Sequence, residues 1–297
     1  MKAFVIAEHS DAAAQLAAGA RTVADEVAVA VINAEVPAGI ADAAYHVAVP
    51  EGAIADDAYG AIATVLDADV VIAEPTRHVK SVVGRLAAAK GAAVITDCLS
   101  IADGAAVSMY FGGVGQITRK AKGTAFYTVA PSVFGDAAAS GSNGAAEELA
   151  WVAPANAAKL VASEPVVKSG VDLTKADVVV ACGRGFVGKT GLNTELIGVA
   201  EQIAAKTNGG VGCSRPLAEG VEGSDFDSYI GVSGLQLTPK VYICAGISGQ
   251  MQHMVGCNRS GVIIAINKDK NAPIFKQCDL GVVGSVEDVL PALAAAL

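Results

Sequence analysis

A glycine-rich loop in the second half of the chain carries the residue types that bind phosphate. Residues 183–190, GRGFVGKT, follow an apolar run and precede a helix-like segment. The loop satisfies GxGxxG, whose glycines let a dinucleotide approach the backbone, and also GxxxxGK[ST], whose lysine and hydroxyl serve a nucleoside triphosphate with magnesium. Because these motifs belong to different folds, the loop predicts a phosphate-tolerant turn and leaves the ligand open.

The residues that would complete either motif differ from the expected ones. A dinucleotide-binding domain of the NAD type needs an acidic residue after its second strand, and that strand ends in Ser214 and Arg215. A P-loop protein needs a magnesium-binding aspartate after a later strand, and residues 263–266 lead to Asn267 instead. A stand-alone nucleotide-dependent oxidoreductase and a P-loop-like nucleotide-binding protein therefore stay as alternative functions.

A second stretch, residues 240–275, places more polar groups at predicted strand ends. An apolar strand is followed by a glycine-serine turn and by a short helix that carries Gln252 and His253. Backbone amides beside small residues form an anion site, because a phosphate can approach them closely. Arg184 and Arg215 follow two other strands, and open α/β sheets bind ligands beyond the carboxyl ends of their strands. The sequence predicts a phosphate-bearing ligand across these ends.

Strand-like and helix-like segments alternate through most of the chain, which predicts parallel sheets covered by helices. In the first half we expect strands at residues 2–7, 27–32, 46–49, 69–73 and 92–96, and helices at 12–24, at 57–66 and up to residue 90. Strands at residues 105–111, 116–120 and 124–130 lack helices between them, which predicts an antiparallel extension, and residues 151–161 predict a returning strand.

The alternation restarts in the second half. We expect strands at residues 177–182, 211–214, 241–245, 262–266 and 280–283, and helices at 192–206 and 286–297. The predicted fold class is α/β, with two Rossmann-like lobes that have mainly parallel sheets. The predicted domains are an N-terminal lobe, residues 1–165, and a C-terminal domain, residues 166–297.

Composition excludes several classes of protein. A net charge of −9 argues against nucleic-acid binding, which needs a concentrated basic face. Charged residues interrupt every long apolar run and the N-terminus lacks a signal-peptide core, so we expect no membrane span and a cytoplasmic location. The six cysteines form no CxxC pair and the four histidines are unclustered, which predicts buried reduced thiols and no metal site. Glu8 and His9 are adjacent at a strand end, and we expect them at the surface.

Six blocks of the second half together resemble the alpha subunit of electron-transfer flavoproteins. They are CGRG at 182–185, CSRP at 213–216, YIGVSG at 229–234, AGISGQMQHMVG at 245–256, AINKDKNAPIF at 265–275 and CDLGVVG at 278–284. Six blocks in the right order are far more specific than one glycine motif. The first half resembles the N-terminal lobe of that family more loosely.

The resemblance implies an FAD site in the C-terminal domain. Arg184 would contact FAD, with Ser214 and Arg215 beside the pyrophosphate and the flavin. The residues along the isoalloxazine ring would be Ile230, Gly231, Val232 and Ser233. Phosphate-binding amides, and a histidine near the flavin C2 carbonyl, would come from Ser248, Gly249, Gln250, Met251, Gln252 and His253. The adenosine end would be held by Asn267, Asp279 and Leu280.

The resemblance also implies partners. Family members form a heterodimer with a beta subunit and carry electrons between dehydrogenases and a second redox partner, without turning over a substrate of their own. The N-terminal lobe would be the platform for the beta subunit. Val232 and Ser233 replace the Gln-Thr of the commonest flavin loop, and this form is similar to the FixB-like branch. The dehydrogenase is expected to be of the acyl-CoA dehydrogenase type. Which dehydrogenase it is, and whether the beta subunit carries FAD or AMP and so lets the pair bifurcate electrons, is left open.

Overall fold

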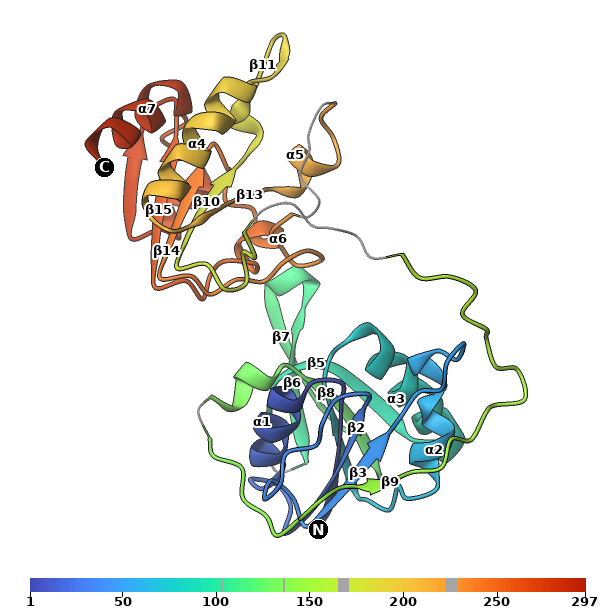
Figure 1. The fold of residues 1–297 in the computed structure, drawn as a ribbon. Helices are drawn as coiled ribbons and strands as arrows, with labels where there is room; N and C mark the ends of the chain where they lie inside the picture. The colour runs from blue at the N-terminus through green and yellow to red at the C-terminus, as the bar shows by residue number, and fades with distance from the viewer. Residues whose placement is uncertain (103, 136, 165–170, 223–228) are drawn as a thin grey trace. The chain divides into compact units, whose positions relative to one another are not determined.

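The computed structural model describes residues 1–102, 104–135, 137–164, 171–222 and 229–297. They form two compact units (Figure 1). The N-terminal unit comprises residues 1–111 and 115–164, and the C-terminal unit comprises residues 112–114 and the described residues from 171 onward. The predicted domain boundary between residues 165 and 166 lies outside the described residues.

The N-terminal unit is built on one sheet, with the strand order β7-β6-β5-β8-β4-β1-β2-β3-β9 in the part of the chain that the structure describes. The strands are β1 (Lys2–Ala7), β2 (Glu26–Ile32), β3 (Ala43–Val47), β4 (Val70–Ala73), β5 (Ala93–Ala102), β6 (Ala105–Tyr110), β7 (Gly115–Lys120), β8 (Ala125–Val129) and β9 (Glu147–Glu148). The helices are α1 (Ser10–Ala20), α2 (Tyr59–Ala63) and α3 (Arg77–Lys90). Neighbouring strands are parallel except β5–β6 and β6–β7.

Each face of this sheet has its own core, because successive strand residues point to opposite faces. On one face Val5 packs with Leu16 of helix α1. On the other, Phe4 and Ile6 pack with Leu86 of helix α3. The apolar run of β1 is therefore buried on both sides, as a central strand of a parallel sheet requires.

Two predicted elements of this unit were wrong. Strand β8 was expected in the antiparallel extension, but it pairs in parallel with both β4 and β5. Residues 151–161 were expected to form a strand, and none is present there. This segment contains Pro154, which cannot donate to a strand ladder, and Val161 is 92% exposed. The returning strand is instead the two-residue β9.

Glu8 and His9 follow β1, and each contacts a residue near the end of β4. His9 Nδ1 lies 2.6 Å from Glu74, and the Glu74 carboxylate also accepts the Glu8 amide at 2.8 Å. Glu8 in turn accepts hydrogen bonds from Thr76 and contacts His78 Nδ1 at 2.7 Å. The His9 side chain is 64% exposed and that of Glu8 only 18%, so the surface prediction was wrong for Glu8. The two residues form separate pairs.

The His9–Glu74 pair predicts a pH dependence of stability. Its hydrogen bond to Glu74 raises the pKa of His9 above 6.5, so the stabilisation is complete below that value and is lost as pH rises through the raised pKa. Because the imidazole is largely exposed, we expect less than about 1 kcal/mol. In denaturant unfolding of the full chain, His9→Ala should lose more stability at pH 5.5 than at pH 8. An equal loss at both pH values would contradict this prediction.

The C-terminal unit is built on a parallel sheet of strand order β13-β10-β14-β15-β16 within the described residues. The strands are β10 (Val178–Cys182), β13 (Gly210–Cys213), β14 (Val241–Ala245), β15 (Val262–Asn267) and β16 (Leu280–Val283), with a separate hairpin of β11 (Val187–Gly188) and β12 (Gly191–Leu192). The helices are α4 (Thr194–Lys206), α5 (Arg215–Ala218), α6 (Met251–Met254) and α7 (Val286–Ala296). This arrangement confirms the predicted fold class.

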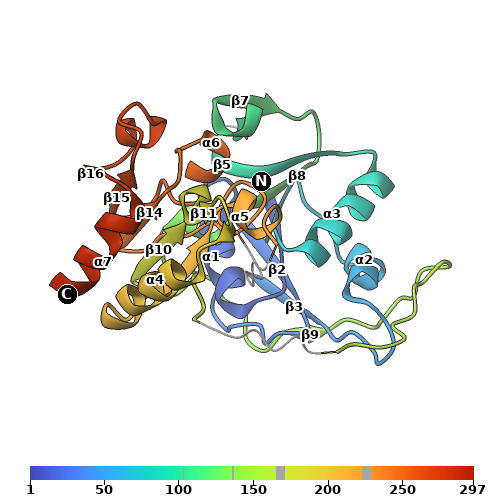
Figure 2. The ribbon, with the colours of Figure 1, turned by 90° about the horizontal axis from the view of Figure 1, so that it is seen from above.

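Helices α4 and α7 lie side by side over one face of this sheet (Figure 2). Their buried residues Leu196, Ile203 and Leu290 pack against Val180 and Ile243. The opposite face is covered by irregular segments and by the region around α6, including Ile247, Met254 and Cys257. Among the described residues there is no helix with the length and apolar character needed to cross a membrane.

Candidate cofactor site

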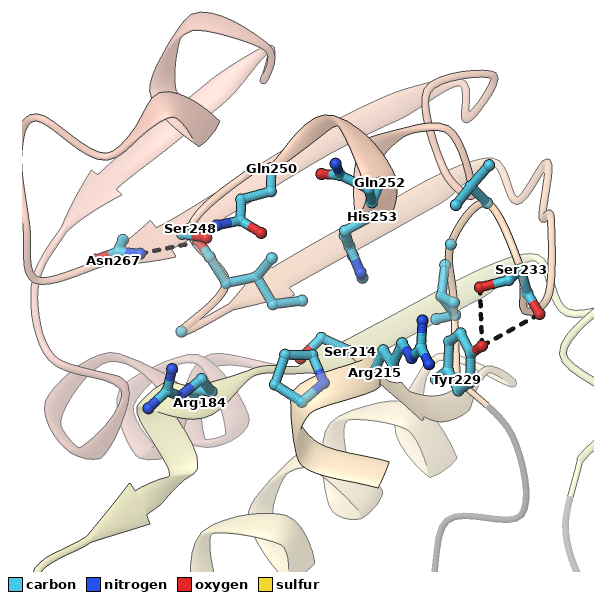
Figure 3. Close-up of a pocket in the computed structure, with 16 residues that line it drawn as sticks. Arg184, Ser214, Arg215, Tyr229, Ser233, Ser248, Gln250, Gln252, His253 and Asn267 are labelled. Carbon is cyan, nitrogen blue, oxygen red and sulfur yellow. Dashed lines mark hydrogen bonds between the residues drawn. The ribbon is translucent and has the colours of Figure 1, made fainter. Parts of the chain in front are cut away.

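A cavity of about 540 Å³ opens at the carboxyl edge of the C-terminal sheet (Figure 3). From β10 the chain proceeds to β13 on one side and later to β14 on the other, and such a switch point is where open α/β sheets bind ligands. The walls follow β10, β13, β14 and β15, with one further loop. The lining residues are Arg184, Ser214, Arg215, Pro216, Tyr229, Ile230, Gly231, Val232, Ser233, Gly246, Ile247, Ser248, Gln250, Gln252, His253 and Asn267.

The first part of the glycine-rich loop joins the ends of β10 and β14. The Gly183 amide donates to the Ala245 carbonyl at 2.9 Å, and the Gly185 amide donates to Gly246 at 3.1 Å. A Cβ at position 183 would lie 2.4 Å from the Gly246 oxygen, so a side chain cannot fit there. These glycines allow the two loops to pack backbone against backbone, and Arg184 between them lines the cavity.

The second part of this loop does not have the shape of a P-loop. Lys189 and Thr190 form the turn of the β11–β12 hairpin. Helix α4 begins only at Thr194, after Asn193 caps it by accepting the Leu196 amide at 3.0 Å. In a P-loop the helix follows directly on the GK[ST] residues. The P-loop alternative is therefore wrong for these residues.

Two arginine side chains lie on one side of the cavity, opposite Ser248 and Gln250 (Figure 3). Arg215, just after β13, donates through Nε to Glu219 at 2.6 Å, and its guanidinium lies 5.6 Å from the centre of the Tyr229 ring. Arg215 is 61% exposed. In a chain whose net charge is −9, two cations at one cavity favour an anionic ligand.

The loop of residues 229–233 is held against α6. The Val232 amide donates to the Gln252 carbonyl at 2.7 Å, and the hydroxyls of Tyr229 and Ser233 lie 2.9 Å apart. The Val232 side chain is 39% exposed. The hydroxyl of Ser233 is thus oriented by Tyr229, a residue that sequence reasoning did not select.

The turn after β14 contributes Ser248 and Gln250 to the cavity wall. Gly249 has φ +84°, and a Cβ there would lie 2.4 Å from the Ile274 nitrogen, whose N–H donates to the Ser248 carbonyl at 3.0 Å. Asn267 Nδ2 fixes the turn further by donating to Ile247 at 2.9 Å. The amides of Ser248, Gly249 and Gln250 find no acceptor among the described residues. Successive free amides of this kind form a concave anion site.

His253 is 8% exposed and lines the same cavity. Its Nε2 lies 2.9 Å from the Tyr242 hydroxyl, whereas its buried Nδ1 has no hydrogen-bond partner among the described residues. A buried polar atom without a partner costs free energy. A ligand that hydrogen-bonds this ring would remove that cost.

The structure brings most of the predicted site residues together. Twelve of them line the cavity, and Gly249 and Met251 belong to the same turn and helix. Asp279 and Leu280 do not line it. They lie at the amino end of β16, where Asp279 accepts the Ile263 amide at 2.8 Å. The amino ends of parallel strands lie at the opposite edge of a sheet, so the strand-end argument favours the residues after Val283 instead.

Four lining residues were not predicted: Pro216, Tyr229, Gly246 and Ile247. All four fall inside or beside the blocks CSRP, YIGVSG and AGISGQMQHMVG. The rule that ligands bind beyond strand ends would have selected Gly246 and Ile247, because they follow β14 directly.

The fold and the site define a Rossmann-like domain that binds an anionic dinucleotide. Comparisons with known proteins identify the family. Residues 172–258 match the electron transfer flavoprotein FAD-binding domain. The chain is 38% identical over 299 residues to Protein FixB of Escherichia coli (strain IAI39) and of Shigella flexneri, covering 95% of this chain and 94% of each relative. The chain belongs to the electron-transfer flavoprotein alpha subunit family, on its FixB-like branch, and its cofactor is FAD.

The residues present fit FAD. The free amides of the turn after β14 and two guanidinium groups match a pyrophosphate, and His253 lines the cavity wall. The cavity walls also supply apolar surface from Ile230, Val232 and Ile247, as a flat aromatic ring requires.

Proposed function

We propose that this chain is the FAD-binding alpha subunit of a heterodimeric electron-transfer flavoprotein. In this role it carries electrons between an acyl-CoA dehydrogenase-type enzyme and a second redox partner, and has no substrate of its own. The observation that carries the proposal is a single cavity lined by Arg184, Arg215 and His253 and bordered by a turn with three unpaired backbone amides. Membership of the family supports it.

Bound FAD supplies one- and two-electron redox chemistry. The chain's own residues bind and orient it. The amides of Ser248, Gly249 and Gln250 would donate to phosphate oxygens, while Arg184 would add charge. Arg215 places positive charge at the cavity, which favours a more negative ligand.

His253 would lie against the flavin ring, with its imidazole positioned by the contact between Nε2 and Tyr242. Asn267 would act indirectly. Its amide supports the turn by donating to Ile247, and it lines the cavity beside Ser248. For these reasons the proposed FAD site comprises the lining residues together with Gly249 and Met251.

The N-terminal unit would be the platform for the beta subunit. Strands β5 and β6, and the turn after β6, carry large apolar side chains in solvent, with Leu99 39%, Tyr110 42% and Phe111 76% exposed. Exposed apolar groups on neighbouring strands favour burial against another protein. The cytoplasmic location stays a prediction.

Co-expression with a beta subunit from the same organism tests the heterodimer. We expect a one-to-one complex in gel filtration, with flavin absorption bands and FAD released on denaturation. A colourless complex would refute a redox role. A stable, fully FAD-loaded monomer of this chain alone would count against an obligate heterodimer.

The dehydrogenase partner can be tested with the same complex. Anaerobic mixing with an acyl-CoA dehydrogenase and its acyl-CoA substrate should bleach the flavin bands at a rate that depends on dehydrogenase concentration. Direct bleaching by NADH or by acyl-CoA, without a second protein, would favour the stand-alone oxidoreductase instead.

A further inference from the structure

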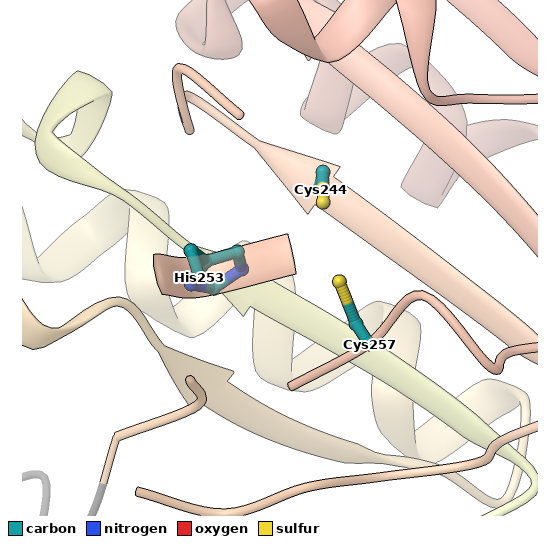
Figure 4. A group of neighbouring side chains, drawn as sticks. All are labelled: Cys244, His253 and Cys257. Carbon is teal, nitrogen blue, oxygen red and sulfur yellow. The ribbon is translucent and has the colours of Figure 1, made fainter. Parts of the chain in front are cut away.

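Three side chains of types that bind soft metals lie close together in the core of the C-terminal unit (Figure 4). Cys244 lies on β14, His253 in α6, and Cys257 just beyond that helix. All three are buried, and Cys244 and Cys257 are both 0% exposed. One ligand atom from each lies within 4.8 Å of the other two.

Local structure explains why these residues converge. Tyr242 and Cys244 are two apart on β14 and face the same side of the sheet, as strand periodicity requires. His253 and Cys257 are four apart, and turn hydrogen bonds such as Val255 to Met251 at 3.0 Å continue the helical winding between them. Residues four apart lie on one helix face.

We propose that Cys244, His253 and Cys257 bind a zinc ion. Zinc binds thiolates at about 2.3 Å and imidazole at about 2.1 Å in tetrahedral geometry, so its ligand atoms lie about 3.5–3.8 Å apart. The ligand atoms lie within 4.8 Å of one another. Side-chain shifts of about 1 Å, which small rotamer adjustments supply, would bring them to the distances that zinc requires.

Because the site is buried, it favours a metal ion whose complex with these ligands has no net charge. Two thiolates and a neutral imidazole with a divalent cation give a neutral complex, whereas Cu⁺ would leave one negative charge buried. An uncompensated buried charge is costly. Magnesium and calcium prefer oxygen ligands, and sulfur with imidazole suits zinc.

Tyr242 would not bind the metal itself but would orient one of its ligands. Its hydroxyl lies 2.9 Å from His253 Nε2, and a metal-binding histidine is commonly oriented by such a partner. Three protein ligands leave one tetrahedral position for a water molecule. Because His253 also lines the FAD cavity, a bound zinc would hold its ring in one orientation at the cavity wall. The zinc site shares His253 with the cavity wall, and its metal content can be measured with or without flavin.

Metal analysis of the purified heterodimer tests the proposal. The complex would be expressed with added zinc, kept reduced with a phosphine, and passed through gel filtration without chelator. We expect about one zinc per chain, and loss of that zinc in Cys244→Ala and in Cys257→Ala. Cys98→Ala is the matched control, because Cys98 is also buried, lies in the N-terminal unit, and donates to the Ile95 carbonyl at 3.3 Å.

Cobalt substitution gives a second measurement that needs no variant. Co²⁺ added to zinc-depleted wild-type complex should produce thiolate-to-cobalt charge-transfer absorption, which zinc then removes. Absence of that absorption, or of bound zinc in the reduced wild type, would overturn the proposal. So would equal zinc content in wild type and both cysteine variants, or a Cys244–Cys257 disulfide that persists under phosphine and excludes the metal.

Discussion

Replacing Gly249 with alanine is expected to remove most of the bound FAD and to destabilise the C-terminal unit. The residue has φ +84°, a conformation that costs a side-chain-bearing residue about 1–2 kcal/mol. The new Cβ would also lie 2.4 Å from the Ile274 nitrogen, so the backbone that supports the turn must move. We expect a total loss of at least about 2 kcal/mol, within the range for strained backbone sites.

The measurement is the ratio of flavin to protein absorbance, together with thermal unfolding. Gly198→Ala is the matched control, because Gly198 lies inside helix α4 of the same unit and a Cβ there meets nothing within 4 Å. Alanine is favoured over glycine in a helix by roughly 0.5–1 kcal/mol, so this variant should keep its FAD and unfold at the same or a higher temperature. If Gly249→Ala matches it in both measurements, the turn is not the phosphate site.

Opposite charge changes at one ion pair should shift the flavin potential in opposite directions. Arg215 lies at the cavity and is paired with Glu219 at 2.6 Å. Removing the cation by Arg215→Gln disfavours the reduced, more negative flavin and should lower the midpoint potential. Removing the anion by Glu219→Gln frees the cation and should raise it.

The shift should be modest, because Arg215 is 61% exposed and solvent screens the field of an exposed charge. We expect about 30–60 mV in each direction, where about 59 mV corresponds to a tenfold change in a one-electron equilibrium.

Spectroelectrochemical titration of the FAD-loaded complex measures these shifts. Arg259→Gln is the control, because Arg259 is exposed in the same unit and does not line the cavity. It changes net charge by the same amount at a different place. Equal shifts for Arg215→Gln and Arg259→Gln would show that total charge, and not local placement, sets the potential.

The strands of the C-terminal sheet could be predicted from sequence because they are buried on both faces. Runs such as VYICA of β14 and VIIAIN of β15 are continuous apolar segments, which parallel sheets require. The site followed from the same logic, since Arg184 and Arg215 come directly after strand ends. The placement of Asp279 came from the resemblance alone and does not agree with the strand-end rule.

Other features depend on contacts between segments far apart in sequence. The GKT residues match a P-loop in type, but only the pairing of Val187 with Leu192 shows that they form a hairpin turn. Strand β5 continues to Ala102, well beyond the predicted residue 96, because it pairs with β6 and not because its residues are apolar. The pairing of His253 with Tyr242 also depends on how α6 packs on β14.

The backbone contact between Gly183 and Gly246 has a kinetic consequence. Two loops in such close contact cannot open independently, so the cavity is already ordered before FAD binds. Binding of FAD therefore costs the protein little conformational entropy. Release of FAD then requires both loops to separate together, a rare local opening event. We expect a slow dissociation rate that tracks hydrogen exchange of the Gly183 and Gly185 amides.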